Sequence, residues 1–149
     1  SLGYGKGFTE SAELFGRLLR MFDALQKKKM HVILLSHVGI RTFNDPEREP
    51  YDRWEMSTHK KVSAMIREWV DFNLFANYEV STRTSGQGFK ETTRAVSYGK
   101  RKLFHKYTAA FDAKSRVDLG VAPLDLDWTA FMTAFKQSLK SKKEGEKNV

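Results

Sequence analysis

The feature that most constrains the fold is a short apolar run that directly follows an amphipathic segment. Residues 31–37 read HVILLSH, so four consecutive apolar residues stand between a histidine and a serine–histidine pair. A continuous aliphatic run of this length predicts a strand buried on both faces, as in a parallel sheet. The preceding segment has apolar residues at helical spacing, namely Leu14, Phe15, Leu18, Leu19, Phe22 and Leu25. A helix that leads into such a strand is half of a parallel helix–strand unit.

Further along the chain, the pattern predicts a second helix, an antiparallel hairpin and a C-terminal helix. Apolar residues recur at helical positions from Val62 to Val70 and again after Pro123. Residues 74–82 and 92–98 have strand composition and flank a Ser-Gly-Gln-Gly turn at 85–88. Each helix has a capping candidate at its start: Thr9 or Ser11 for the first, Ser57 or Thr58 for the second, and Asp125 or Asp127 for the third.

The composition favours one folded domain, and the predicted order of helices and strands places it in the α/β class. Of the 149 residues, 40% are hydrophobic and 13% are aromatic, which is enough for a modest core. We expect this domain to span residues 1–140, followed by a basic disordered tail at 141–149. Residues 38–58 show no periodicity, and a polar stretch of this length predicts a functional or mobile loop.

The charge and the residue types limit which kinds of partner and which chemistry the chain can have. The formal charge is +8, and a basic protein is attracted to nucleic acid, although solubility alone accounts for the charge equally well. No apolar run approaches the roughly 20 residues of a membrane span, so we expect no membrane partner. Cysteine is absent, which excludes disulfides and thiolate chemistry and fits a cytoplasmic protein.

The glycine-rich segment near the start resembles a phosphate-binding loop only superficially. Such a loop needs the pattern G-x-x-x-x-G-K-[ST], in which backbone amides wrap the phosphates and a hydroxyl binds Mg²⁺. Here Lys6 is followed by Gly7, and Lys100 is followed by Arg101. The sequence as given therefore contains no phosphate-binding loop.

His37 ends the predicted buried strand, at the edge where open parallel sheets bind ligands. An imidazole there is placed to contact a phosphate oxygen or to orient a water molecule. The alternative is a structural histidine that is hydrogen-bonded to the backbone. The four histidines show no metal-ligand spacing, so no metal site is expected.

The polar segment after His37 mixes positive charge with aromatic rings. Single-stranded nucleic acid is bound by this combination, since guanidinium groups contact phosphates and flat rings stack on bases. The same segment has five acidic residues, so an ordinary solvated loop is the alternative. The candidate DNA-binding residues are Arg41, Arg48, Tyr51, Arg53, Trp54, Lys60 and Lys61.

Lys114 and Arg116 stand two residues apart at the end of a predicted extended segment, so that they share one face. Two cations at a sheet edge are suited to reach across a subunit boundary and stabilise phosphate charge, as an arginine finger does. The alternative is salt bridging to Asp112 or Asp118.

Taken together, several stretches resemble the phage nucleotide-binding proteins of the RecA-like P-loop ATPase superfamily, a group linked to phage recombination and single-strand annealing. The resemblance covers roughly residues 3–135. It implies that His37 senses the γ-phosphate, that residues 39–57 contact DNA, and that Lys114 and Arg116 bind the nucleotide of a neighbouring subunit. The matching stretches are residues 30–37 (MHVILLSH), 45–53 (DPEREPYDR), 59–61 (HKK) with the helix to Trp69, 74–78 (LFANY) and 111–116 (FDAKSR).

The resemblance also has a gap, because the family's Walker A lysine and Walker B aspartate would precede the matched region. ATP and Mg²⁺ are therefore expected in the complete family protein and not on this chain alone.

The implied fold is a partial RecA-like core: a parallel strand flanked by helices, an antiparallel hairpin and a C-terminal helix. The implied role is in a phage or prophage recombination ATPase in the bacterial cytoplasm, without hydrolysis by the chain alone. The expected partners are further copies of the chain or the missing N-terminal half, with single-stranded DNA as a possible ligand. The alternative is a non-catalytic single-stranded DNA-binding or protein-interaction module.

Overall fold

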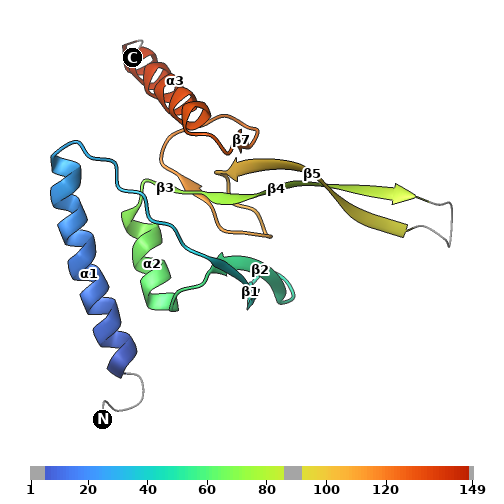
Figure 1. Ribbon diagram of the computed structural model, residues 1–149, viewed down its shortest axis with the longest axis horizontal. Coiled ribbons are helices and arrows are strands. Elements are labelled where there is room, and N and C mark those ends of the chain that lie inside the picture. Colours follow the sequence, from blue (N-terminus) through green and yellow to red (C-terminus); the bar gives the residue numbers. More distant parts are fainter. Residues whose placement is uncertain (1–5, 86–91, 148–149) are drawn as a thin grey trace. The chain divides into compact units, whose positions relative to one another are not determined.

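The computed structural model describes residues 6–85 and 92–147 and contains both helices and sheets (Figure 1). The α/β class expected from the sequence is confirmed at this level. The chain divides into two compact units, which are described separately below. The first unit comprises Ser1–Val70 with Ala109–Phe111, and the second comprises Asp71–Thr108 with Asp112–Val149.

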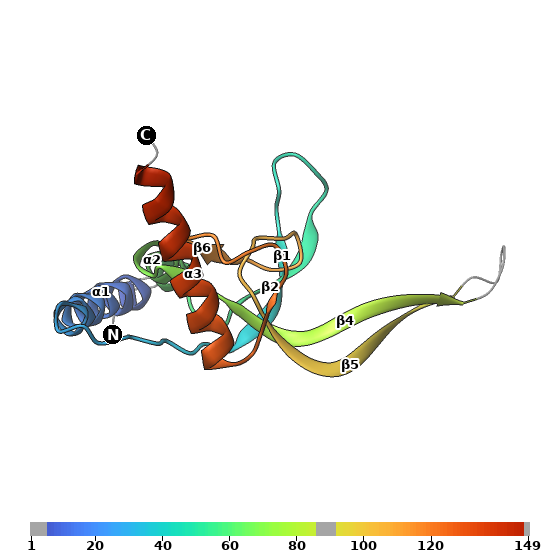
Figure 2. The same ribbon diagram turned by 90° about the horizontal axis from the view of Figure 1, so that it is seen from above.

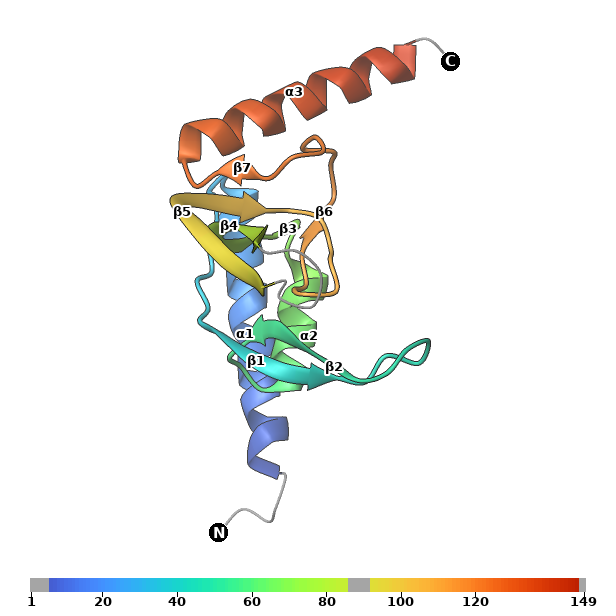
Figure 3. The same ribbon diagram turned by 90° about the vertical axis from the view of Figure 1, so that its right-hand side faces the viewer.

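Two helices lie side by side in the first unit: α1 (Lys6–Lys27) and α2 (Lys60–Trp69) (Figures 1 and 3). Ala12 of α1 and both Val62 and Ile66 of α2 form the buried cluster between them. Gly16 allows the close approach, since a Cβ atom at this position would lie 3.0 Å from the Met65 side chain. The expected apolar face of α2 is therefore confirmed. That of α1 is confirmed in part, because Leu19 is buried whereas Leu14 and Leu18 are exposed.

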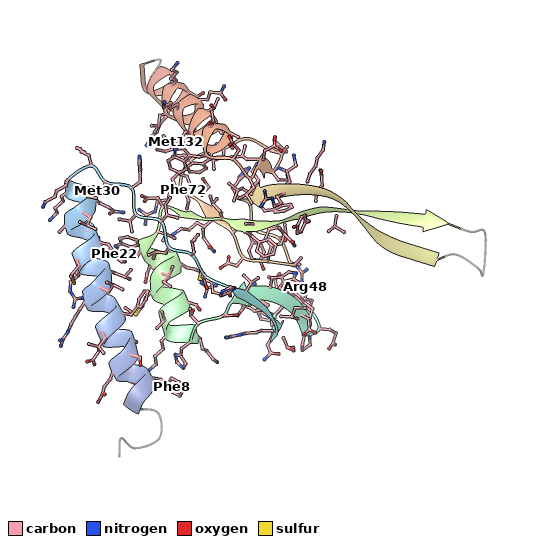
Figure 4. All side chains as sticks on the ribbon, viewed as in Figure 1. Phe8, Phe22, Met30, Arg48, Phe72 and Met132 are labelled. Carbon is pink, nitrogen blue, oxygen red and sulfur yellow. The ribbon has the colours of Figure 1, made fainter. Side chains whose placement is uncertain are left out.

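Aromatic and polar contacts join the far ends of the same two helices. The Trp69 indole nitrogen donates a hydrogen bond of 2.7 Å to a carboxylate oxygen of Asp23. Phe22, labelled in Figure 4, lies with its ring centroid 6.1 Å from that of Trp69. A buried indole N–H needs an acceptor, and Asp23 satisfies this requirement.

The helix caps differ from those expected. Ser11 lies inside α1, where its hydroxyl donates to the Gly7 carbonyl oxygen at 2.7 Å. Thr9 also lies inside α1, because the helix begins earlier, by Lys6. The cap of α2 is His59, whose side chain accepts from the Lys61 amide. The expected caps Ser57 and Thr58 precede His59: the Ser57 amide donates to the His37 carbonyl oxygen at 2.8 Å and continues the hairpin, and the Thr58 hydroxyl lies 2.6 Å from that of Ser63.

The segment expected to be an irregular loop is a β-hairpin of β1 (Val38–Phe43) and β2 (Tyr51–Met56) (Figure 3). The strands pair without a bulge, from Val38 opposite Met56 to Phe43 opposite Tyr51. The Thr42 hydroxyl donates to Asp52 across the ladder at 2.8 Å. The prediction of a loop was wrong because polar and charged residues occupy both faces of this hairpin, which removes the alternation that marks a half-buried strand.

The apolar run at residues 31–37 is the second difference from expectation. In the part of the chain that the structure describes, this run is extended but is assigned to no strand. Every described strand ladder is antiparallel, and the parallel pairing seen is an isolated bridge between Trp54 and Phe111. The predicted parallel strand is therefore not seen, because a strand forms only where a neighbour supplies its hydrogen bonds.

The second unit is built on an antiparallel sheet in the order β4–β5–β7 (Figure 3). It consists of β4 (Phe75–Ser85), β5 (Thr92–Phe104) and β7 (Leu124–Asp125). A smaller pair is formed by β3 (Phe72–Asn73) and β6 (Lys114–Ser115). The expected hairpin is confirmed, although the turn proposed for residues 85–88 lies mostly outside the described residues.

Helix α3 (Trp128–Lys147) closes the second unit. Its Phe131 and Phe135 rings contact Phe72 edge-on at centroid distances of 5.2 and 5.5 Å (Figure 4). Asp127 caps the helix by accepting from the Ala130 amide at 2.9 Å, as one of the two expected candidates. A disordered tail was expected to begin after residue 140. Helix α3 continues through this position and ends at Lys147.

None of the described helices combines the length and the apolar character that are needed to cross a membrane.

Candidate functional site

His37 lies where the extended segment meets β1. Its carbonyl oxygen accepts hydrogen bonds from the Ser57 amide at 2.8 Å and from the Ser36 hydroxyl at 2.9 Å. Its side chain is exposed, so the imidazole is accessible to a ligand in solution. The alternative of a buried structural histidine fits His105 better, since that side chain is 3% exposed and lies 3.1 Å from the Ala122 carbonyl oxygen.

The segment that leads to His37 exposes apolar side chains on one edge. Leu34 packs against the core between α1 and α2, and Val32 is half-buried. The intervening residues point elsewhere, since Ile33 is 65% exposed and Leu35 is 94% exposed. Because Ile33 and Leu35 stand two residues apart in one extended segment, their exposed side chains form a candidate surface for a partner.

Arg53 is held within the β1–β2 hairpin and is not displayed on its surface. It is 5% exposed, and its guanidinium group donates to the Glu55 carboxylate at 2.9 and 2.7 Å. The guanidinium carbon also lies 3.7 Å from the centroid of the Phe43 ring. In this arrangement Arg53 stabilises the hairpin, and it would contact DNA only after leaving Glu55. The DNA contact expected of Arg53 stays a prediction.

The other candidate DNA-binding residues of the hairpin are more accessible. Trp54 is 36% exposed and stands opposite Ile40 in the ladder. Arg48, at the end of the hairpin in Figure 4, pairs with Asp45 at 3.1 Å and lies 6.0 Å from the Tyr51 ring. Arg48 is the exposed member of its pair, at 59% against 15% for Asp45, so its guanidinium group is accessible from solvent.

Three further basic side chains surround the beginning of α2. Arg41 donates to the Thr58 carbonyl oxygen at 3.2 Å, and Lys61 donates to the Thr9 hydroxyl at 3.1 Å. Lys60 and Lys61 are both exposed, and the first turn of α2 has no acidic residue. His59 stacks on Phe8 at a centroid distance of 4.4 Å. Positive charge beside the positive end of a helix dipole is unfavourable unless an anion is present.

Lys114 and Arg116 belong to the second unit, whereas His37 and the β1–β2 hairpin belong to the first. Lys114 is half-buried in β6, opposite Asn73. Arg116 follows the end of β6, and its guanidinium group pairs with Asp71 at 3.3 Å. The sequence suggested Asp112 or Asp118 as the salt-bridge partner, whereas the carboxylate in this ion pair is that of Asp71.

An ion pair that the sequence did not suggest joins β5 to β7 in the second unit. Lys102 donates to Asp125 at 2.7 Å, whereas Asp125 was considered only as a helix cap. This hydrogen bond lowers the pKa of Asp125 and raises the pKa of Lys102. The two residues are far apart in sequence and are joined by the β5–β7 ladder, so no local pattern could have indicated the pair.

Among the described residues, no group of three acidic or histidine side chains is placed to hold a metal ion. The sequence also contains no phosphate-binding loop pattern. What the described residues offer is an accessible histidine, a basic and aromatic hairpin, and two cations near a strand end.

A comparison with known protein families identifies the class of domain to which the chain belongs. The model of an AAA domain family matches residues 1–117. The chain belongs to this family. AAA domains are P-loop ATPase-like nucleotide-binding domains, and the matched region includes His37, the β1–β2 hairpin, Lys114 and Arg116. Helix α3 lies outside the match.

Two further comparisons gave no match. No curated protein resembles the chain closely enough to be counted as a relative. No solved structure matches it either.

Proposed function

We propose that this AAA-domain chain contributes phosphate sensing, subunit contacts and single-stranded DNA binding to a RecA-like ATPase. The setting we propose is phage or prophage recombination or strand annealing in the bacterial cytoplasm. ATP and Mg²⁺ belong to the assembled protein, and the chain alone does not turn over ATP. The phosphate-binding loop comes from a segment outside the sequence given or from a partner.

The observation that carries this proposal is the extended apolar segment that ends at His37. A P-loop ATPase core is built on a parallel sheet whose strands are covered on both sides. Residues 31–37 have the composition of such a strand, and Leu35 is 94% exposed. The proposal is that strands from the P-loop-bearing part pair with this segment and cover Ile33 and Leu35. His37 would then stand at the ligand-binding edge of a RecA-like core.

The proposed roles of Lys114 and Arg116 are supported by their charge and by the loose pairing of Arg116. The Arg116 and Asp71 side chains are 56% and 57% exposed, and their separation is 3.3 Å. Such a pair is worth at most about 1 kcal/mol, so a nucleotide phosphate can compete with Asp71 for the guanidinium group. We propose that the phosphate belongs to the nucleotide of a neighbouring subunit.

Single-stranded DNA is proposed to bind on the β1–β2 hairpin and on the beginning of α2. Trp54 and Tyr51 would stack on bases, while Arg41, Arg48, Lys60 and Lys61 would neutralise phosphates. Arg53 supports the hairpin from within, and a direct contact with DNA would require the loss of its bonds to Glu55.

An ATPase assay tests the first part of the proposal. The purified chain should show no Mg²⁺-dependent release of phosphate from ATP, with or without single-stranded DNA. Appreciable turnover by the chain alone would overturn the claim that a P-loop-bearing segment is required.

A fluorescent oligonucleotide titration tests the DNA role. Trp54→Ala should weaken binding to single strands, because one base-stacking ring is worth about 1–3 kcal/mol. The matched control is Trp128→Ala, which removes a tryptophan that is 51% exposed on α3. If the two variants bind alike, the hairpin is not the binding surface. If neither strand form binds, the alternative of a protein-interaction module replaces the DNA role.

A further inference from the structure

The β4–β5 ribbon extends well beyond the strand that supports it. β7 pairs with β5 only at Lys102 and Leu103, so the ladder from Val80 to Ser85 is two-stranded within the described residues. Figure 2 shows this part as a long twisted ribbon. A two-stranded hairpin buries too little apolar surface to be stable alone, so stability does not explain its length.

The composition of the two-stranded part is polar and basic. Among the eleven residues at 81–85 and 92–97, seven are serine or threonine and two are arginine. A sheet face that packs on a core needs alternating apolar residues, which this stretch lacks. The sequence of this part therefore indicates a solvated ribbon with a net positive charge.

A β-bulge near the base of the ribbon displays more positive charge. The register shifts between Tyr78 and Val80, and Gly99 on the opposite strand has φ of +72°. Lys100 and Arg101, which follow this glycine, are both exposed. Tyr78 is 51% exposed and stands opposite Arg101. Bulges increase the local twist and redirect side chains, which here turns two cations toward solvent.

The dimensions and the charge of the ribbon match a nucleic-acid duplex. At about 3.3 Å per residue, β4 with its 11 residues is roughly 36 Å long, close to one turn of B-form DNA. The major groove admits a two-stranded ribbon, and hydroxyl and guanidinium groups bind phosphates. The two strands contain one acidic residue, Glu79, and five basic ones: Arg83, Arg94, Lys100, Arg101 and Lys102.

We propose that the β4–β5 ribbon is a contact arm for double-stranded nucleic acid, with Lys100 and Arg101 as phosphate contacts at its base. Single strands are bound mainly by rows of stacking rings, and Tyr78 is exposed here whereas Phe75 is buried. Pairing with another protein strand is disfavoured by the basic edge. The proposal does not depend on the ATPase role, and it concerns a surface distinct from the β1–β2 hairpin.

Fluorescence anisotropy with a 20-base-pair duplex, measured with the full chain at two salt concentrations, tests the arm. Lys100→Ala combined with Arg101→Ala should weaken binding about tenfold at low salt and reduce the slope against salt concentration by about two. The matched control, Lys140→Ala combined with Lys142→Ala, removes two exposed charges from α3 and should change binding little.

A second pair of substitutions keeps the test independent of folding. Arg83→Gln combined with Arg94→Gln removes two positive charges from the ribbon and keeps polar side chains there, so it should weaken duplex binding without lowering the thermal unfolding temperature. Trp54→Ala should leave duplex binding unchanged, which separates this arm from the proposed single-strand surface. The proposal is overturned by an absence of duplex binding, by equal losses in the α3 control, or by ribbon variants that change the oligomeric mass and not duplex binding.

Discussion

At the scale of single residues, the β1–β2 hairpin depends on a buried cation. Arg53 combines two hydrogen bonds to Glu55 with a guanidinium-to-ring distance of 3.7 Å at Phe43. Charge-assisted hydrogen bonds of this kind contribute more than neutral ones, and desolvation strengthens the contact with the ring. Arg53 therefore contributes to the packing of the hairpin, and its guanidinium group already contacts Glu55 and Phe43 without any ligand.

Arg53→Ala should lower the free energy of unfolding by about 2 kcal/mol, because it removes these bonds and leaves Glu55 without its cation. Chemical denaturation measures the change. The register partner Arg41 provides the control, since its side chain is exposed and Arg41→Ala should cost less than about 1 kcal/mol. Equal losses for the two variants would contradict the assigned role.

The Lys102–Asp125 pair predicts a particular dependence of stability on pH. The lowered pKa of Asp125 means that its contribution is present above its ordinary pKa of 3.8 and is lost as pH falls through the lower folded value. The raised pKa of Lys102 means that its contribution is present below 10.5 and is lost as pH rises through the higher folded value.

The stability difference between the wild type and Asp125→Asn should therefore be constant near neutral pH and shrink at both extremes. Thermal unfolding across the pH range measures this difference. Glu49→Gln, which removes an exposed carboxylate in the first unit, is the control and should not reproduce the profile. A difference that grows below pH 3.8 would be incompatible with the ion pair.

At the scale of elements, the segment at residues 31–37 is extended without being a strand. Within the described residues, the amides of Val32, Ile33, Leu34 and Leu35 donate no hydrogen bond. The next segment along the chain, β1, is part of a regular ladder. We therefore expect the amides of these two consecutive segments to differ in their protection from hydrogen exchange.

Hydrogen exchange should therefore be fast at residues 32–35 and slower in the β4–β5 ladder near Phe75 and Phe104, where the amides are paired. Mass spectrometry of the isolated chain measures both regions. Slow exchange at residues 32–35 would show that this segment already has a hydrogen-bonded neighbour.

The cap of α3 provides a second prediction for an element. Asp127→Ala should destabilise the second unit by about 1 kcal/mol, because the Ala130 amide loses its acceptor. Thr129→Ala, at an exposed position in the first turn, is the matched control and should have a smaller effect. Denaturant unfolding followed by circular dichroism compares the two variants.

At the scale of the whole molecule, the two compact units have different candidate ligands. The first unit contains His37 and the hairpin proposed to bind single strands, and the second contains the ribbon, Lys114 and Arg116. The family match spans residues from both units. The exposed edge at Ile33 and Leu35 is the surface that we expect a partner to cover.

The chain should therefore self-associate unless the partner strand is present, and Ile33→Thr combined with Leu35→Ser should shift it toward the monomer. Sedimentation velocity at several concentrations measures the shift. The matched control is Val121→Ser, at an apolar side chain in the second unit that is 89% exposed. A monomeric wild type, or an equal effect of the control, would count against a covered edge at residues 31–37.

The sequence alone determined the elements whose signals are local. These are the apolar face of α2, the hairpin of β4 and β5, and the cap at Asp127, which follow from spacing and from residue type because neighbours along the chain form these contacts. The residues of the candidate sites were named from their chemistry, but their exposure was not available from the sequence.

Only the tertiary structure decided which of those side chains are accessible and what each one contacts. It buried Arg53 against Phe43, paired Arg116 with Asp71, and left residues 31–37 without a neighbouring strand. The physical reason is that hydrogen-bond partners and burial come from segments distant in sequence. An apolar run becomes a strand only when another strand is beside it.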